Sequence, residues 1–252
     1  MPKIQDCSQC LHRPQCLMGQ IDAMHHATVR PYLLYQTRLS PGDVLIYPGM
    51  PFERVYLVRY GSFKTVLLAS EGQLHTAGLH CNGDVLGLDG LDGGQHQCEV
   101  TALQHASVCV FRFDQLCELS LRVNQVQRAL LTAISRSMQR DWHQMLLLGS
   151  MDGEERVASF LLMLRHRQAL SATAADSLDL MMTRQEIGSY LGMTLESVSR
   201  HLSQFQRRGW IRLDRRRVDI LQPESLQHKR DRCLSLRPSS SMGWNEQSSH
   251  RI

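Results

Sequence analysis

Short apolar runs separated by glycines dominate the chain between Arg38 and Phe113. They read VLIY, VYLVRY, FKTVLL, EVTAL and SVCVFRF, with a glycine-rich stretch from Gly83 to Gly94 before the last two. Strands at this spacing, divided by turn residues, are typical of an antiparallel barrel or sandwich. We therefore predict a β-domain over residues 21–120, preceded by a cysteine-containing arm of residues 1–20.

A helical period replaces this pattern over residues 121–150. No Gly or Pro interrupts Leu121 to Leu148, so the pattern predicts one helix of about 28 residues that Gly149 ends. Six positions follow gaps of three and four along one stripe: Leu131, Ile134, Met138, Asp141, Met145 and Leu148. Such a heptad seam favours packing against a second copy of the helix, and a core helix packed on the barrel is the alternative. In a symmetric dimer the two Asp141 carboxylates approach each other, so we expect this residue to weaken association.

Residues 151–222 have the pattern of a small helical module. Its first helix has one apolar stripe, and the polar loop SATAADS follows it; the stripe consists of Val157, Phe160, Leu161 and Leu164. Thr183 and Glu186 form a capping box for a second helix, which Gly192 closes. Thr194 caps a third helix, which ends at Gly209. Two helices joined by about three residues, with glycine in the turn, indicate a helix-turn-helix.

The third helix of this module has two distinct faces. Its inward stripe, at i, i+4 and i+7, consists of Val198, Leu202 and Phe205. Its outward stripe lies near the amino end, where a recognition helix meets base edges, and consists of Glu196, Ser199, Arg200 and Ser203. Arg200 can bond guanine O6 and N7 while Glu196 accepts from cytosine N4, so together they suit a G·C pair. The alternative is an ordinary Glu196–Arg200 surface pair, which stabilises a helix by only about 0.2 to 0.5 kcal/mol.

A basic hairpin is predicted after the third helix. The runs WIRL and VDIL flank DRRR, which places Arg215, Arg216 and Arg217 at the hairpin tip. There they would contact phosphate and add affinity without reading sequence. Residues 223–252 lack periodicity, and we expect them to form a mobile, irregular tail without stable structure.

The charge distribution favours a nucleic-acid partner. The chain has 252 residues, of which 42% are hydrophobic and 21% charged, and its net charge is +4. Residues 181–232 alone hold 11 Lys and Arg against 6 Asp and Glu, so this segment carries the whole basic excess. A basic module of this kind suits double-stranded DNA. No apolar run is long enough for a membrane span and the start lacks a signal peptide, so we expect a cytoplasmic protein with no membrane partner.

The cysteine spacing indicates a metal centre rather than disulfides. In a reducing compartment the eight cysteines are poor disulfide candidates. Cys7, Cys10 and Cys16 place three thiols within ten residues, and thiolate-rich sites favour zinc or an iron–sulfur cluster. A fourth ligand is needed, and on spacing alone the candidates are equal: Cys81, Cys98, Cys109, Cys117 and Cys233. Histidines on the polar stretches nearby are expected to be solvated, namely His12, His25 and His26.

Several motifs together resemble the catabolite-activator/FNR superfamily. MTRQEIGSYLGMTLESVSRHLSQFQRRG is similar to its helix-turn-helix, and GDVLGLDGL, the heptad helix ending in MLLLG and EERVASF occur in the family's order. Glu196, Ser199 and Arg200 resemble the E-x-x-S-R of the FNR branch. The resemblance runs from Cys7 to about Leu221 and implies an α+β protein. Its expected parts are an amino-terminal antiparallel β-barrel of the cyclic-nucleotide-binding jelly-roll type, a long dimerisation helix and a carboxy-terminal winged helix-turn-helix.

The resemblance to the FNR branch also implies a mode of action. It implies an oxygen-responsive homodimer that binds TTGAT-like inverted repeats without oxygen and acts on RNA polymerase, as activator or repressor. The family's fourth ligand lies in a pattern like A-x-x-x-S-V-C, and ALQHASVCVFRF puts Cys109 there. The implied cofactor is a [4Fe-4S] cluster on Cys7, Cys10, Cys16 and Cys109, with zinc as the alternative. Additional DNA contacts are expected from Thr183, Thr194 and Ser203.

Other functions have weaker sequence support. Nucleotide-binding members of the family hold the cyclic phosphate with an Arg-Ser pair. Here Gln97 and Cys98 stand at the matching positions and no arginine lies between Gly83 and Thr101, so we expect no cyclic nucleotide. The alternatives are a zinc-stabilised regulator with another signal and a thiol redox enzyme using the first two cysteines. Such an enzyme needs its C-x-x-C inside a βαβ unit, which the sequence does not predict, so we expect no enzyme.

Overall fold

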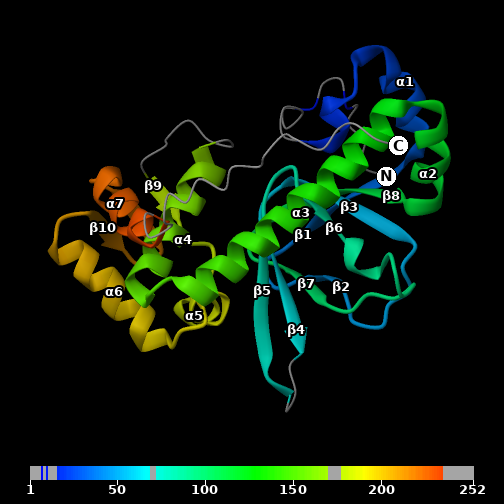
Figure 1. The fold of residues 1–252 in the computed structure, drawn as a ribbon. Helices are drawn as coiled ribbons and strands as arrows, with labels where there is room; N and C mark the ends of the chain where they lie inside the picture. The colour runs from blue at the N-terminus through cyan, green and yellow to red at the C-terminus, as the bar shows by residue number, and fades with distance from the viewer. Residues whose placement is uncertain (1–6, 8–9, 11–15, 69–71, 170–176, 235–252) are drawn as a thin grey trace, which may run out of the picture.

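The amino-terminal half of the molecule is a β-barrel made of two four-stranded antiparallel sheets. The computed structural model describes residues 7, 10, 16–68, 72–169 and 177–234 (Figure 1). One sheet has the strand order β1-β8-β3-β6 and the other β2-β7-β4-β5. The strands are β1 (Leu33–Leu39), β2 (Val44–Ile46), β3 (Arg54–Tyr60), β4 (Phe63–Leu68), β5 (Leu74–His80), β6 (Val85–Leu86), β7 (Glu99–Ala102) and β8 (Ala106–Arg112). The predicted antiparallel barrel is confirmed, although β1, β5 and β6 were not among the expected runs.

Strand β8 separates two hydrophobic cores, because its alternate side chains point to opposite faces. Val108 and Val110 are fully buried in the barrel interior. Phe111 and the half-buried Cys109 belong instead to a second core outside the barrel. Four short helical turns lie between the arm's Cys16 and β1: η2 (Leu17–Gln20), η3 (Ala23–His25), α1 (His26–Val29) and η4 (Arg30–Tyr32). Residues of η2, α1 and η4 contribute to this second core. The arm and the barrel therefore meet on the outer face of β8.

Two helices, rather than the single predicted one, follow the barrel. Helix α2 (Phe113–Arg122) and helix α3 (Asn124–Ser150) are divided at Val123, whose φ of −128° and ψ of 93° are extended. The Val123 side chain is 4% exposed in the second core, so burying it turns the chain between the helices. The prediction that Gly149 ends the helix is also wrong, since α3 continues to Ser150. In Figure 1 α3 runs from the barrel to the carboxy-terminal module.

The carboxy-terminal module is a winged helix-turn-helix. Its elements are α4 (Gly153–Ala169), β9 (Ser177–Asp179), α5 (Arg184–Leu191), α6 (Leu195–Arg207), β10 (Ile211–Asp214), β11 (Arg217–Ile220) and α7 (Pro223–Leu234). The three strands form an antiparallel sheet in the order β10-β11-β9, which includes the predicted hairpin. The predicted apolar stripe of α4 is buried at Val157, Phe160, Leu161 and Leu164. None of the described helices is long and apolar enough to cross a membrane.

Helix α7 corrects the expectation of an irregular tail from residue 223 onward. Pro223 stands at the start of the helix, where its missing N–H costs nothing. Leu226 is fully buried in the core of the module, and α7 packs along α4. The sequence suggested a tail because, among the described side chains of α7, Leu226 alone is apolar and buried. Residues 235–252 lie outside the described part of the chain.

Candidate DNA-reading helix and cysteine site

Local caps define the turn between α5 and α6. The Thr183 hydroxyl accepts from the Glu186 backbone N–H at 3.2 Å, and Glu186 Oε2 accepts from the Thr183 N–H at 2.7 Å. Gly192 ends α5 with φ 61°, a left-handed conformation that suits glycine. Gly188 is also required, because a Cβ there would lie 2.7 Å from the Met193 carbonyl oxygen. The predicted capping box is confirmed, whereas the close approach at Gly188 was not predicted.

Both ends of α6 are capped as the sequence predicts. The Thr194 hydroxyl accepts from the Ser197 N–H at 3.2 Å. At the other end the Gly209 N–H donates to the Gln206 carbonyl and the Trp210 N–H donates to the Phe205 carbonyl, each at 3.0 Å. These two bonds form a Schellman motif, and Gly209 has φ 73°. The inward stripe is buried at Val198, Leu202 and Phe205.

The outward face of α6 is open to solvent. Glu196, Arg200 and Ser203 are exposed, and Ser199 is half-buried. The Arg200 guanidinium lies 3.4 Å from the Ser197 hydroxyl oxygen, within the helix's own first turns. The backbone N–H of Glu196 and the Thr194 hydroxyl lower the pKa of the Glu196 carboxyl, so it is held as an acceptor near the amino end. Among the described contacts Arg200 bonds to Ser197 and forms no ion pair with Glu196, so the surface-pair alternative has no support there.

The three hairpin arginines differ in their surroundings. All are exposed, but Arg217 donates to the Ser177 hydroxyl at 2.6 Å and lies 3.7 Å from Asp219. Arg215 has a left-handed φ of 52° at the turn, and its carbonyl accepts from Arg184 at 3.3 Å. Burial and the nearby charge of Arg216 lower the pKa of Arg184. The bond of Arg184 to the Arg215 carbonyl places it beside the hairpin, a position that the sequence does not predict.

The predicted seam of α3 is mostly free on this chain. Leu131, Met138 and Met145 are 60%, 47% and 68% exposed, Asp141 is exposed and Ile134 is half-buried. Trp142, which the sequence analysis did not include, is 60% exposed between them. Leu148 differs, because it packs against the core of the helix-turn-helix module. Five of the six seam residues therefore remain available to a second helix.

Arg156 joins the end of α3 to the turn of the helix-turn-helix, a role that the sequence analysis missed. Its guanidinium donates to the carbonyl oxygens of Leu148 at 2.8 Å, Met151 at 2.9 Å and Leu191 at 3.0 Å. The last turns of α3 and α5 both present unpaired carbonyls with negative partial charge. One cation thus ties together the carboxyl ends of two helices.

A second junction connects the barrel to α3 and α4. The Asp84 carboxylate, in the turn after β5, accepts from Arg140 of α3 at 3.0 Å and from Arg167 of α4 at 3.2 Å. Cys81 N–H also donates to Asp84 at 3.0 Å. A cavity of about 570 Å³ borders this junction and includes His80, whose pKa burial lowers to about 4. The barrel therefore contacts both the long helix and the DNA-binding module.

The four predicted ligands share one neighbourhood in the structure. Cys7 and Cys16 of the arm and Cys109 of β8 all pack against the second core. Burial, followed by the nearby thiols of Cys16, Cys7 and Cys10, raises the pKa of Cys109 to about 12, and Arg59 opposes this rise. The Gln36 side chain donates to the Cys109 sulfur at 3.6 Å. Within the described ranges no three His, Cys, Asp or Glu side chains are already set to hold a metal ion, so the thiols are gathered but not in ligand geometry.

The other cysteines and histidines have separate surroundings. Cys81 is buried at the junction beside Arg167, Cys98 is buried in the barrel and Cys117 is exposed on α2. The side chain of Cys233 and all of His12 lie outside the described residues. His26 is buried, and its Nε2 lies 3.1 Å from the Ile21 carbonyl oxygen, so the expectation that it is solvated is wrong.

The segment that matches a cyclic-phosphate site is filled by an acidic residue. Asp89 accepts from the Gln97 N–H at 2.8 Å and from the Cys98 thiol at 3.2 Å, and it pairs with His96 at 3.1 Å. Burial alone would raise the pKa of Asp89, but the bonds from Gln97, His96 and Cys98 hold it below its usual range. The donors of His96, Gln97 and Cys98 in this segment therefore all bond to one carboxylate.

The geometry defines the class of protein: a β-barrel joined by a long helix to a winged helix-turn-helix. The family model described as Crp-like helix-turn-helix domain matches residues 155–229, and the cyclic nucleotide-binding domain matches residues 36–122. The transcriptional regulatory protein btr of Bordetella pertussis is 34% identical over 220 residues, 87% of this chain and 91% of that protein. The transcriptional activator protein Anr of Pseudomonas protegens is 34% identical over 220 residues, 87% of this chain and 90% of that protein.

A solved structure agrees with these relatives. FixK2 from Bradyrhizobium japonicum aligns with a TM-score of 0.70 and 30% identity over 77% of this chain and 96% of that one. The chain belongs to the CRP/FNR family of DNA-binding transcription regulators, and it is not an enzyme. Relatives named for fumarate and nitrate reduction and for anaerobic regulation identify it as an FNR-type member.

Proposed function

We propose that the chain is an oxygen-responsive regulator whose Cys7, Cys10, Cys16 and Cys109 hold a [4Fe-4S] cluster. The observation that supports this proposal is that Cys7 and Cys16 of the arm pack against the same hydrophobic core as Cys109 on β8. An all-thiol donor set fits a [4Fe-4S] cluster. A bound cluster supplies an oxygen-labile link between the arm and the barrel.

The arm is placed to affect the long helix. Leu17, Met18 and Ile21, just after Cys16, are buried in the same core as the start of α3. The Asp22 N–H also donates to the Gln125 side chain of α3 at 2.8 Å. Tying Cys16 to β8 therefore restrains the first turns of α3, whose exposed seam we assign to a homodimer. At the other end of α3, Arg156 connects the helix to the helix-turn-helix, because it donates to the carbonyls of both Leu148 and Leu191.

The dimer would bind inverted repeats similar to TTGAT when oxygen is absent and act on RNA polymerase. Glu196, Ser199 and Arg200 are the proposed base readers, because they share the open face of α6 near its amino end. The proposed supporting contacts to DNA are Thr183, Thr194, Ser203, Arg215, Arg216 and Arg217. Of the hairpin arginines, Arg215 and Arg216 have the fewest competing protein contacts, so we expect them to dominate the phosphate contribution.

Spectra and operator binding of one anaerobically purified sample test the proposal. Before the sample is exposed to air, we expect iron–sulfur absorption and tight binding to a TTGAT inverted repeat. After exposure to air, both the absorption and the binding should be lost together. Zinc is the second candidate, because its ligand chemistry is also satisfied by four thiolates. A colourless protein that contains zinc and binds the operator equally in air would replace the proposal with a zinc-stabilised regulator.

A further inference from the structure

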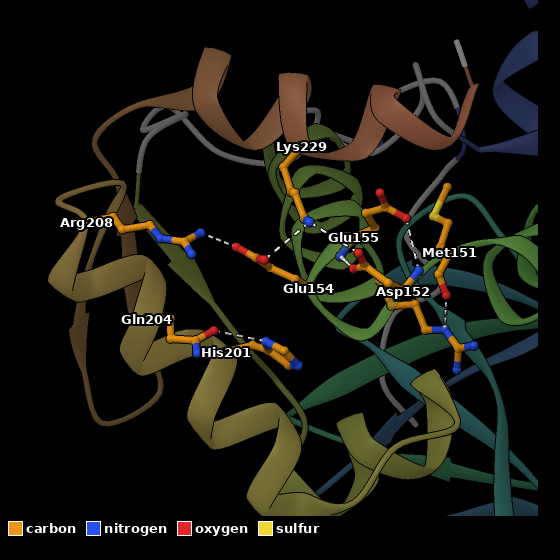
Figure 2. Close-up of polar contacts among 9 residues, drawn as sticks. Met151, Asp152, Glu154, Glu155, His201, Gln204, Arg208 and Lys229 are labelled. Carbon is orange, nitrogen blue, oxygen red and sulfur yellow. Dashed lines mark hydrogen bonds and ion pairs between the residues drawn. The ribbon is translucent and has the colours of Figure 1, made fainter. Parts of the chain in front are cut away.

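Helix α7 places a lysine beside the joint between the long helix and the DNA-binding module. Lys229 is only 9% exposed, and its ammonium lies 3.2 Å from Asp152 and 3.2 Å from Glu154. Figure 2 shows Lys229 reaching from α7 toward both carboxylates. An enclosed ammonium needs such partners, because removing it from water is otherwise costly. Lys229 therefore makes a specific connection in this fold rather than contributing to the solvated face of α7.

One partner of Lys229 belongs to the joint itself. Asp152 follows Met151, the residue at the carboxyl end of α3. Asp152 accepts from the Glu155 N–H at 2.8 Å, and its own N–H donates to Glu155 at 3.0 Å. This reciprocal pair begins α4 directly after α3. Lys229 thus holds the residue at which the chain passes from the long helix to the module.

The other partner of Lys229 leads to the reading helix. Glu154 also forms an ion pair with Arg208, which caps the carboxyl end of α6. The Arg208 guanidinium lies 5.0 Å above the Trp210 ring, and that ring stacks on Phe205, whose side chain anchors α6. Burial alone would raise the pKa of Glu154, but Lys229 and Arg208 together hold it below its usual range, so Glu154 is charged and serves both cations. Figure 2 shows Arg208, Glu154 and Lys229 in one row.

We propose that Lys229 is a positioning residue for DNA reading, which fixes the direction of α6 relative to α3. The inference rests on the proposed function, in which α3 pairs with its copy and the two α6 helices read two half-sites. Dimers of this kind read half-sites about one helical turn of DNA apart. The spacing that this dimer prefers therefore depends on the angle between α3, which pairs with its copy, and α6. Releasing the row of charges lets this angle vary, so the preference for one half-site spacing weakens although the reading face is intact.

Operator spacing is the readout that a purely structural role does not change. Wild-type, Lys229→Met and Lys229→Arg full-length proteins, all purified anaerobically, are compared on the inverted repeat and on repeats with one base pair added or removed. Gln227→Ala, on the exposed face of α7, is the matched control. We expect Lys229→Met to lose about tenfold in affinity for the native spacing and much less on the altered ones. Lys229→Arg and the control should keep the wild-type preference.

Hydrogen exchange without DNA separates this inference from the proposed function. Lys229→Met should speed amide exchange around residues 152–156 and 204–210 and leave the barrel unchanged, whether or not the operator is the right one. If wild type shows no spacing preference, the dimeric inverted-repeat function fails, and exchange alone decides the role of Lys229. Unchanged exchange and spacing preference in Lys229→Met would overturn the inference. An equal loss on every duplex would overturn it too, because it would reduce Lys229 to a folding residue.

Discussion

The DNA-reading face and the cysteine site are built in opposite ways. The reading face comes from one continuous stretch, in which caps at Thr183 and Thr194 and the Schellman turn at Gly209 define both helices. The cysteine site joins the arm to β8, and its thiols lie near one another without ligand geometry. The reading face is thus formed by the folded chain alone, whereas the proposed function assigns a cluster to the cysteine site. In that proposal the cysteine site changes with oxygen and the reading face does not.

The largest effect should come from breaking the cysteine site alone. Cys109→Ser removes the one proposed ligand outside the arm, so the arm loses its link to β8. We expect the iron–sulfur absorption to disappear and operator affinity to fall to the non-specific level, a loss of about 1,000-fold or more. Cys7→Ser, Cys10→Ser and Cys16→Ser should do the same. Cys81→Ser, at the Asp84 junction, is the control that keeps both properties, and a normal cluster in Cys109→Ser would refute the ligand assignment.

A second effect concerns His80, beside the Asp84 junction that connects the barrel to α3 and α4. Burial lowers the pKa of His80 from 6.5 to about 4. Between pH 6.5 and 4 this imidazole is therefore protonated in the unfolded chain but neutral in the folded one. Stability therefore falls as the pH drops from 6.5 to 4, by up to about 3 kcal/mol from this residue. His80→Gln should flatten that part of the pH profile of urea unfolding, measured on air-exposed protein. Identical slopes for the two proteins would show that His80 titrates normally.

The reading face should respond locally to substitution. Arg200→Ala removes a proposed bidentate base contact and should cost about 1 to 3 kcal/mol on the specific site, with relaxed preference at one G·C pair. Arg216→Ala should instead weaken binding to all duplexes alike and lower the salt slope by about one. Titrations of specific and random duplexes at several salt concentrations distinguish them. Equal losses on both duplexes for Arg200→Ala would make it a phosphate contact, and neither substitution should alter the cluster spectrum.

The smallest predicted effect concerns the proposed dimer seam on α3, the helix that lies between the cysteine site and the reading face. Asp141 is exposed on α3 beside apolar seam residues, and in a symmetric dimer it lies near its own copy. Removing one like-charged pair at an exposed position should strengthen dimerisation roughly two- to fivefold. Sedimentation of the air-exposed Asp141→Ala protein should therefore show more dimer than wild type, with some DNA binding in air. An unchanged monomer–dimer constant would exclude Asp141 from the control of dimerisation.

Features set by near neighbours in the chain were predictable. The caps at Thr183 and Thr194, the buried stripe of α6 and its exposed face follow from residues within a few turns of each other. Helix α7 was not predictable in this way, because its stability depends on Leu226 entering a core formed elsewhere. The break at Val123 has the same origin, since nothing nearby in sequence forbids a continuous helix.

Features set by distant contacts needed either the family resemblance or the fold. Spacing grouped the three arm cysteines, but the resemblance alone selected Cys109 among five candidates. Arg156 reads as an ordinary charged residue on a helix until the fold brings the carbonyls of α3 and α5 around it. Asp89 likewise reveals its role only when the chain folds back so that Gln97 and Cys98 donate to it.

In the proposed function, cluster binding at the cysteine site controls whether the already formed reading face binds its operator. The most direct test is a reconstitution series without oxygen, in which iron and sulfide are added stepwise to cluster-free protein. Cluster absorbance and the operator-bound fraction are measured on every sample. The account predicts that bound DNA rises in parallel with cluster content, from non-specific levels at zero to saturation at one cluster per chain. Full operator binding at zero cluster, or none at full cluster, would contradict it.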